Sequence, residues 1–131
     1  MTNTYSRKHG EDSEQAAVVY WAALSQKRYP ALKWLYHIPN GGKRNKVEAA
    51  RLKLQGVKAG VSDLFLPAAI GGYHGLYIEM KYGKNKPTEA QLEFMHDMSA
   101  AGYCCKVAYG AQQAISYLQQ YLAGTIDSGT K

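Results

Sequence analysis

Hydrophobic and polar positions repeat along this chain with two different periods, which separate helices from strands. Apolar residues at helical spacing predict helices over residues 14–29, 46–55, 87–102 and 111–122. Short apolar or alternating runs predict strands over residues 33–38, 61–67, 75–82 and 103–109. This order predicts a mixed α/β fold of α+β type, in which helices flank a central, mixed four-stranded sheet.

Capping residues mark the ends of several predicted helices. Ser13 and Asn45 can each accept a hydrogen bond from the first turn of the helix that follows them. Thr88 and Gln91 are spaced as a capping box at the start of the third helix, and Gly102 ends that helix.

The length of 131 residues predicts one domain with a real core. Polar tails over residues 1–10 and 124–131 are expected to be disordered, which leaves residues 11–123 as the domain. The chain shows neither the apolar run of roughly 20 residues that a membrane span needs nor the apolar region of a signal peptide. Cys104 and Cys105 are adjacent, which argues against both a disulfide between them and a zinc site. We expect a cytosolic protein.

The strand "GLYIEMKY" carries an acid and a base where a buried strand would be apolar. Because side chains alternate across a strand, Glu79 and Lys81 share one face with Tyr77. If this strand pairs with "VSDLFLP" in an antiparallel hairpin centred on residue 71, Asp63 lies directly opposite Glu79. A two-residue turn at Gly71-Gly72 would put them on opposite faces, so this hypothesis requires an odd-numbered loop.

Two neighbouring carboxylates repel each other unless a cation lies between them. Magnesium is a suitable ion because it binds one or two carboxylates and keeps several waters and phosphate oxygens. Asp63, Glu79 and Lys81 therefore indicate metal-assisted phosphodiester hydrolysis, in which Lys81 orients or activates the water. The alternative is a half-exposed strand face with a cross-strand ion pair of a few tenths of a kcal/mol.

Two residues on the predicted helices border the same region. Glu14 lies beside the apolar face of the first helix, and Gln91 borders the core-facing stripe of the third. Each has a structural alternative, since Glu14 can interact with the positive helix N-terminus and Gln91 can complete the capping box. Together they support an inward-facing polar site.

The formal net charge of +6 is concentrated in one segment. Six of the 16 basic residues lie between Lys43 and Lys58, where Glu48 is the one acid. Such a block favours a polyanionic partner, most simply nucleic acid, although a solvated basic surface remains the alternative. The residues for which we expect DNA contact are Asn40, Gly42, Lys43, Arg44 and Lys46.

The ordered set Glu14, Asp63, Glu79-x-Lys81 and Gln91 resembles the PD-(D/E)xK nuclease superfamily. More narrowly, the chain resembles the stand-alone VRR-NUC domains of phages and bacteria over residues 11–122. The segments that carry this resemblance are "IPNGGKRNKVEAARLKLQGVKAGVSDLFLP", "IEMK" and "PTEAQLEF".

The resemblance implies a restriction-endonuclease-like core and a role for each site residue. Asp63, Glu79 and the Met80 carbonyl would hold Mg²⁺ or Mn²⁺, with Glu14 as a further ligand directly or through water. Lys81 would position the attacking water, and Gln91 would orient Lys81 or the scissile phosphate. Ser62 stands where the family pattern usually has proline, from which we expect a slight loosening of the strand entry.

The leading hypothesis is a divalent-metal-dependent, structure-selective endonuclease that cuts branched DNA such as junctions or flaps. The resemblance to stand-alone members of the family also implies a homodimer. The expected location is the cytoplasm of a bacterium or phage-infected host. One alternative is a non-catalytic nucleic-acid-binding module on the same fold. Another is a structural protein whose basic segment is soluble surface.

Overall fold

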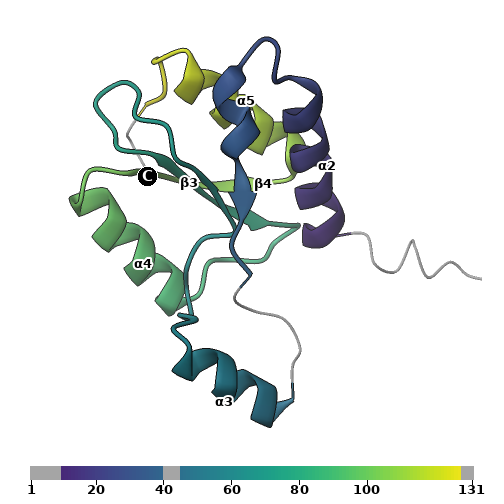
Figure 1. The fold of residues 1–131 in the computed structure, drawn as a ribbon, viewed down its shortest axis with the longest axis vertical. Helices are drawn as coiled ribbons and strands as arrows, with labels where there is room; N and C mark the ends of the chain where they lie inside the picture. Colours follow the sequence, from purple (N-terminus) through teal and green to yellow (C-terminus); the bar gives the residue numbers. More distant parts are fainter. Residues whose placement is uncertain (1–9, 40–44, 128–131) are drawn as a thin grey trace, which may run out of the picture.

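The computed structural model describes residues 10–39 and 45–127, and it shows one mixed four-stranded sheet between helices (Figure 1). The mixed α/β fold is confirmed, and the elements follow the predicted order apart from one short helix, which covers residues 33–34 of the strand predicted over 33–38. Their bounds are α2 Glu11–Leu24, η1 Pro30–Trp34, β1 Tyr36–His37, α3 Lys46–Leu54, β2 Leu64–Leu66, β3 Leu76–Lys81, α4 Glu89–Ala100, β4 Cys104–Tyr109 and α5 Ala111–Leu122.

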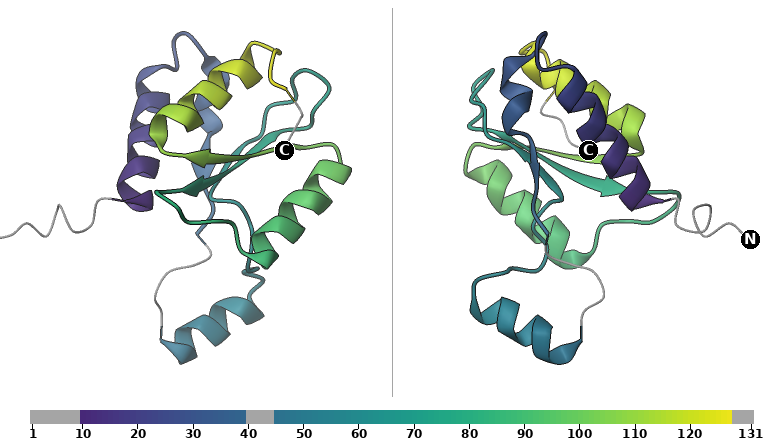
Figure 2. Two further views of the ribbon diagram at one scale, coloured as in Figure 1. Left: turned by 180° about the vertical axis from the view of Figure 1, so that it is seen from behind. Right: turned by 45° about the vertical axis from the view of Figure 1, so that its right-hand side comes forward.

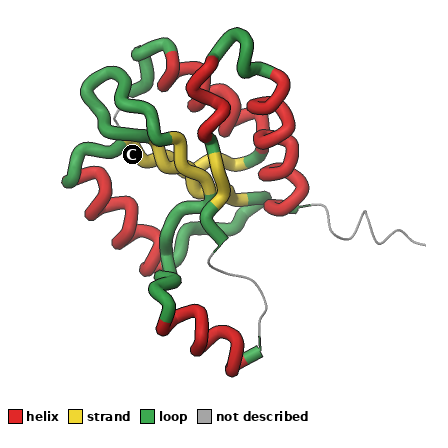
Figure 3. Tube along the Cα trace, in the orientation of Figure 1, coloured by secondary structure: helices red, strands yellow, loops and turns green. Residues whose placement is uncertain are grey.

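The sheet has the strand order β1-β2-β3-β4. The pairs β1–β2 and β2–β3 are antiparallel, whereas β3 and β4 are parallel. A parallel pair needs a crossover because the chain must return to the same end of the sheet. α4 supplies this crossover, and Figure 3 shows the strands in the centre of the body with helices on both sides.

α2 and α5 cover one face of the sheet, and α4 covers the other (Figure 2). The first face holds the apolar core, in which the strand residues meet residues of both helices. α5 buries Tyr121, whose hydroxyl donates a hydrogen bond to the Ala68 carbonyl and so satisfies the polar end of a fully buried ring. Members of this core are Val18, Ala22, Leu64, Leu66, Leu76, Ile78, Met80, Ala114, Leu118 and Tyr121.

On the opposite face, aromatic rings attach α4 to the sheet. Phe65 on β2 stacks on Tyr77 of β3 with ring centroids 4.3 Å apart. Phe94 of α4 meets the Tyr77 ring edge-on at 5.0 Å. The aromatic cluster ends where β3 continues into Glu79 and Lys81, so the polar part of this face lies at the first turn of α4.

The first helix begins earlier than the sequence pattern predicts. Gly10 is the N-cap of α2, and Ser13, the predicted cap, lies inside the helix and accepts a hydrogen bond from the Gly10 N–H at 3.3 Å. The helix ends at Leu24, well before the predicted end at Tyr29. Glu11 therefore lies in the first helical turn, three residues before the predicted start of the helix at Glu14.

The two predicted tails lie mainly outside the described residues. At the C-terminus, however, residues 124–127 are described, and Ile126 packs against the core. The Thr125 N–H also donates to the Gln120 carbonyl at 2.9 Å. The packed chain thus extends beyond the predicted boundary at residue 123. Among the described helices, none has the length and apolar content for crossing a bilayer.

Candidate active site

The hairpin of β2 and β3 has the register that the sequence analysis required. Leu64 pairs with Ile78 and Leu66 with Leu76, so the pairing is centred on residue 71. The same register extended by one residue places Asp63 opposite Glu79 on the α4 face. The expectation of an odd-numbered connection is confirmed, because residues 67–75 join the two strands.

The tip of this hairpin follows a different register from its strands. Ile70 and Tyr73 form a bridge around Gly71 and Gly72, whose φ angles of 64° and 90° suit a tight hairpin turn. Three residues then lead from Ile70 back to Leu66, whereas two lead from Tyr73 to Leu76. The extra residue shifts the pairing by one position, and this shift returns the two acids to the same face.

Groups on both neighbouring segments of the sheet hold Asp63 in place. Its Oδ2 accepts a hydrogen bond from the Met80 N–H at 2.8 Å. Its carbonyl accepts from the Ile38 N–H at 2.9 Å and from the His37 ring Nδ1 at 2.8 Å. The carboxylate is therefore fixed beside Glu79, with one oxygen committed to the backbone and Oδ1 left for other contacts.

Glu79 is a buried acid whose hydrogen-bonding capacity is only partly used. It is 2% exposed, and the Lys81 Nζ lies 3.6 Å from its Oε2. Its Oε1 is buried and has no hydrogen-bond partner among the described residues. A buried carboxylate oxygen without a partner is costly, so this arrangement favours occupation of the site by a cation or a proton.

The electrostatics of the acid pair agree with the geometry. Burial, and then the Asp63 carboxylate, raise the pKa of Glu79 to about 8, although the Lys81 ammonium lowers it in part. Burial also raises the pKa of Asp63, against the lowering effect of its hydrogen bond from Met80. The Glu11 carboxylate contributes to both upward shifts, which shows that its charge lies near the pair.

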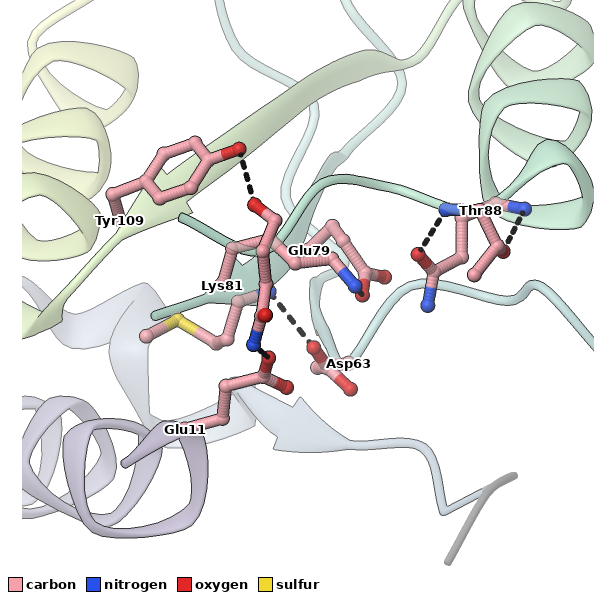
Figure 4. A network of polar contacts seen from close by, with 9 residues as sticks. Glu11, Asp63, Glu79, Lys81, Thr88 and Tyr109 are labelled. Carbon is pink, nitrogen blue, oxygen red and sulfur yellow. Dashed lines mark hydrogen bonds and ion pairs between the residues drawn. The ribbon is translucent and has the colours of Figure 1, made fainter. Parts of the chain in front are cut away.

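The helical acid that faces the site is Glu11 rather than Glu14. Figure 4 shows the Glu11, Asp63 and Glu79 side chains directed toward a common region from α2, the start of β2 and β3. The Asn85 Nδ2 donates to the Glu11 Oε2 at 3.4 Å, and the Tyr109 hydroxyl donates to the Asn85 carbonyl at 2.9 Å. These contacts link Glu11 to the loop that follows β3.

Glu14 makes a structural contact with a neighbouring helix. Its Oε1 accepts a hydrogen bond from the Ala111 N–H at 2.7 Å, at the first residue of α5. The N-cap of α5 is Gly110, which has no side chain to offer, so Glu14 satisfies one of the free amides of that helix. The predicted role of Glu14 as a metal ligand stays a prediction, and Glu11, three residues earlier, is a second candidate for it.

Gln91 lies in the first turn of α4 and completes the predicted capping box, which is confirmed. The Thr88 N–H donates to the Gln91 Oε1 at 2.9 Å, and the Gln91 N–H donates to the Thr88 hydroxyl at 3.2 Å. The Gln91 oxygen has two lone pairs, of which the Thr88 N–H uses one, and the side chain also carries two amide hydrogens. It can therefore donate to a phosphate oxygen or accept from the Lys81 ammonium, so its predicted role stays a prediction.

The structure describes some of the other predicted site residues but not all of them. The Met80 side chain is fully buried on the opposite face, so only its backbone can serve the site. Lys46 is exposed at the first position of α3. Asn40, Gly42, Lys43 and Arg44 lie outside the described residues. Ser62 is fully buried, and its hydroxyl has no hydrogen-bond partner in the described part of the chain.

The acids of the site fit an ion that needs few protein ligands, such as Mg²⁺, better than one that needs a complete cage of side chains. Over residues 10–39 and 45–127, no three His, Cys, Asp or Glu side chains converge as ready-made metal ligands. Mg²⁺ does not need such a cage, because it binds through one or two carboxylates and keeps its waters. The unpartnered Glu79 Oε1 beside Asp63 is the feature that such an ion would satisfy.

Comparison with known proteins gives results that agree with this geometry. The chain matches the VRR-NUC domain family over residues 2–112. It is similar to a solved structure described as a VRR_NUC domain protein, with 36% sequence identity and a TM-score of 0.74. That similarity covers 92% of this chain and 95% of the other. No curated protein matches the chain.

Proposed function

The chain belongs to the VRR-NUC domain family and is therefore a nuclease-type domain, and from this premise we propose that it is a divalent-metal-dependent endonuclease of branched DNA. The observation that carries the proposal is the buried Glu79, whose Oε1 has no partner among the described residues while Asp63 faces it across the hairpin. Such an acid pair gains much more from a bound cation than a solvated surface pair would.

The groups that would hold Mg²⁺ or Mn²⁺ are the Asp63 and Glu79 carboxylates and the Met80 carbonyl. Glu11 would join them directly or through water, in the role that the family resemblance implies for Glu14. When bound, the ion would stabilise negative charge that develops on the phosphate and on the leaving oxygen.

The remaining residues position the reactants. Lys81 is anchored near the Glu79 Oε2, and its other ammonium hydrogens can hold a water in line with the phosphorus. Hydrolysis forms a bond between that water oxygen and phosphorus, while the bond from phosphorus to the leaving sugar oxygen breaks. The attacking water loses one proton to the solvent, and the leaving oxygen takes one from the solvent. The free amide hydrogens of Gln91 can hold a non-bridging phosphate oxygen during this exchange.

The positive charge and the lack of a base-reading motif in the sequence support the proposed substrate. The net charge of +6 favours DNA, and contacts with phosphates position a protein without reading bases. A structure-selective enzyme would use this mode of binding. We further propose that the protein acts as a homodimer, which presents two active sites to a branched substrate, in the cytoplasm of a bacterium or phage-infected host.

The decisive experiment is cleavage of a four-way junction, a flap, a splayed arm and a linear duplex with Mg²⁺, with Mn²⁺ and with EDTA. We expect metal-dependent cleavage of the branched substrates and a loss of at least roughly 100-fold in Asp63→Asn, because the acid pair can then no longer hold the ion. Asp12→Asn is the matched control, since Asp12 is an exposed acid in the first turn of α2.

Two results would contradict the proposal. Equal cleavage by wild type and Asp63→Asn would remove the acid pair from the mechanism. Salt-dependent DNA binding that persists in EDTA, with no cleavage under either metal, would instead identify a non-catalytic binding module.

A further inference from the structure

α3 differs from every other described helix because it is not held by packing. None of its residues is buried, and within the described part of the chain it has no extensive contact with another helix or strand. Figures 1 and 2 show it standing apart from the body, on the same side of the sheet as α4. Isolated helices shorter than roughly 12–15 residues are marginal in water, so α3, with nine residues, has a conformation that its packing does not explain.

Local interactions support α3 in the absence of packing. The Asn45 Oδ1 accepts a hydrogen bond from the Glu48 N–H at 2.7 Å, as the sequence predicted for this cap. Glu48 lies in the first turn, whereas Arg51 and Lys53 lie in the last, which complements the helix dipole. These devices stabilise the helix while leaving its outer surface free for contact with a partner.

The outward face of α3 is basic around a small apolar centre. Helical spacing puts Lys46 and Lys53 on one side of this face and Arg51 on the other, with Val47 and Leu54 between them. Val47 is 79% and Leu54 is 89% exposed. In the described part of the chain, no acidic side chain pairs with Arg51 or Lys53. An extended polyanion complements this face.

The base of α3 is tied to the candidate active site. After the helix ends, the backbone at Gly60 approaches the first turn of α4 so closely that a Cβ atom there would lie 2.4 Å from the Ala90 carbonyl oxygen. Ala90 precedes Gln91, and Gly60 precedes Asp63 by three residues. The helix therefore extends from the part of the chain that holds the catalytic candidates.

From these observations we infer that α3 is an arm that binds the DNA backbone away from the scissile phosphate, through Arg51 and Lys53. The inference rests on the proposed function, since it assigns a second contact with the same substrate. Its placement on the same side of the sheet as α4 allows one DNA molecule to contact the arm and the acid pair together. Because it contacts phosphates, the arm adds affinity for all DNA sequences alike.

The test is the salt dependence of DNA binding by Arg51→Gln/Lys53→Gln, measured in EDTA by fluorescence anisotropy on a four-way junction. Loss of two phosphate contacts should reduce the slope of log K against log salt by about 1.8, and binding near 0.1 M salt should weaken by tens of fold, roughly. Glutamine is a good helix former, so the helix should persist, as circular dichroism would confirm.

The matched control is Lys27→Gln/Arg28→Gln, which removes the same two residue types from an exposed loop at the end of the body far from α3 (Figure 1). Both double variants have the same net charge, so an effect of overall charge would weaken both equally. Arg51→Lys/Lys53→Arg keeps the charges and should bind like wild type.

The outcomes separate this inference from the proposed function. DNA binding by the wild type without cleavage, together with a shallower slope in the arm variant, would overturn the nuclease proposal and support the arm. Cleavage by the wild type with an unchanged slope in the arm variant would overturn the arm alone. If Val47→Ser/Leu54→Ser dissociates a dimer in size-exclusion chromatography while the slope stays unchanged in the arm variant, α3 binds a second copy and the inference is wrong.

Discussion

Two buried charged groups lie on neighbouring strands, and they differ in how completely the fold satisfies them. Lys106 on β4 is 8% exposed, and its ammonium donates to the Asp127 carbonyl and lies 5.5 Å from the centre of the Tyr117 ring. Glu79 on β3 is more deeply buried, yet its one charged contact is Lys81 at 3.6 Å, and its Oε1 has no partner among the described residues.

The comparison separates a structural buried charge from one that is ready for a ligand. Lys106 points to the face covered by α5, where α5 and the chain beyond it supply a ring and a carbonyl. Glu79 points to the other face, where its nearest charged neighbours include two further acids, Asp63 and Glu11. A fold that only needed stability would not leave an acid in such surroundings, because an unpaired buried charge is costly.

The largest expected effect comes from exchanging Lys81 or Lys106 for methionine, which keeps an unbranched side chain only one atom shorter and removes the charge. Lys81→Met should lower DNA cleavage by at least roughly 100-fold, because the attacking water loses its orienting donor. Lys106→Met should leave cleavage per folded molecule unchanged and lower the free energy of unfolding by about 1–2 kcal/mol. Cleavage rates and urea denaturation measure the two effects, and equal activity losses would erase the distinction.

A second pair of substitutions compares the two acids of α2. Glu11→Ala should reduce cleavage by roughly 10- to 100-fold with little change in melting temperature, because Glu11 faces the acid pair. Glu14→Ala should retain activity and lower the free energy of unfolding by about 1 kcal/mol, because the Ala111 N–H loses its acceptor. If Glu14→Ala abolished cleavage at full stability, Glu14 would have the role predicted for it.

The pH dependence of stability tests, without DNA, whether Glu79 is the buried charge that the fold leaves unsatisfied. Since the pKa of Glu79 is raised from its ordinary 4.5 to about 8 in the folded protein, the native state binds more protons than the unfolded state between these values. The stability of the metal-free protein should therefore fall as pH rises from about 5 to 8. Thermal melts in EDTA would show this fall, and Glu79→Gln should flatten it, because glutamine does not titrate.

Added Mg²⁺ extends this measurement. It should raise the melting temperature more at pH 8 than at pH 6, because protons compete with the ion for the same carboxylates. An equal rise at both values would place the ion elsewhere.

The smallest effect concerns Ser62, which is buried beside Asp63 with no hydrogen-bond partner for its hydroxyl among the described residues. Ser62→Ala should increase the free energy of unfolding by about 1 kcal/mol, because it removes an unsatisfied polar atom. Cleavage should stay close to the wild-type rate. A marked loss of stability would show that the hydroxyl has a partner, such as a bound water.

The sequence predicted helix ends correctly where the residues that mark them are close neighbours in the chain. The capping box of Thr88 and Gln91, the cap at Asn45 and the bounds of α5 follow from neighbouring residues, and all three are confirmed. The start of α2 was missed because its N-cap is a glycine, which offers no side-chain signal. The earlier start adds Glu11 to the helix, almost one helical turn before Glu14, as an acid that the sequence analysis did not consider for the site.

The sequence by itself determined the sheet, its flanking helices and the shared face of Glu79 and Lys81, because period and alternation are local properties of the chain. Only the tertiary structure decided that the hairpin shifts its register to bring Asp63 opposite Glu79, that Glu11 turns toward them while Glu14 caps α5, and that α3 stands free. These features depend on which distant groups satisfy each buried charge and each free amide, and such partners are set by packing in three dimensions.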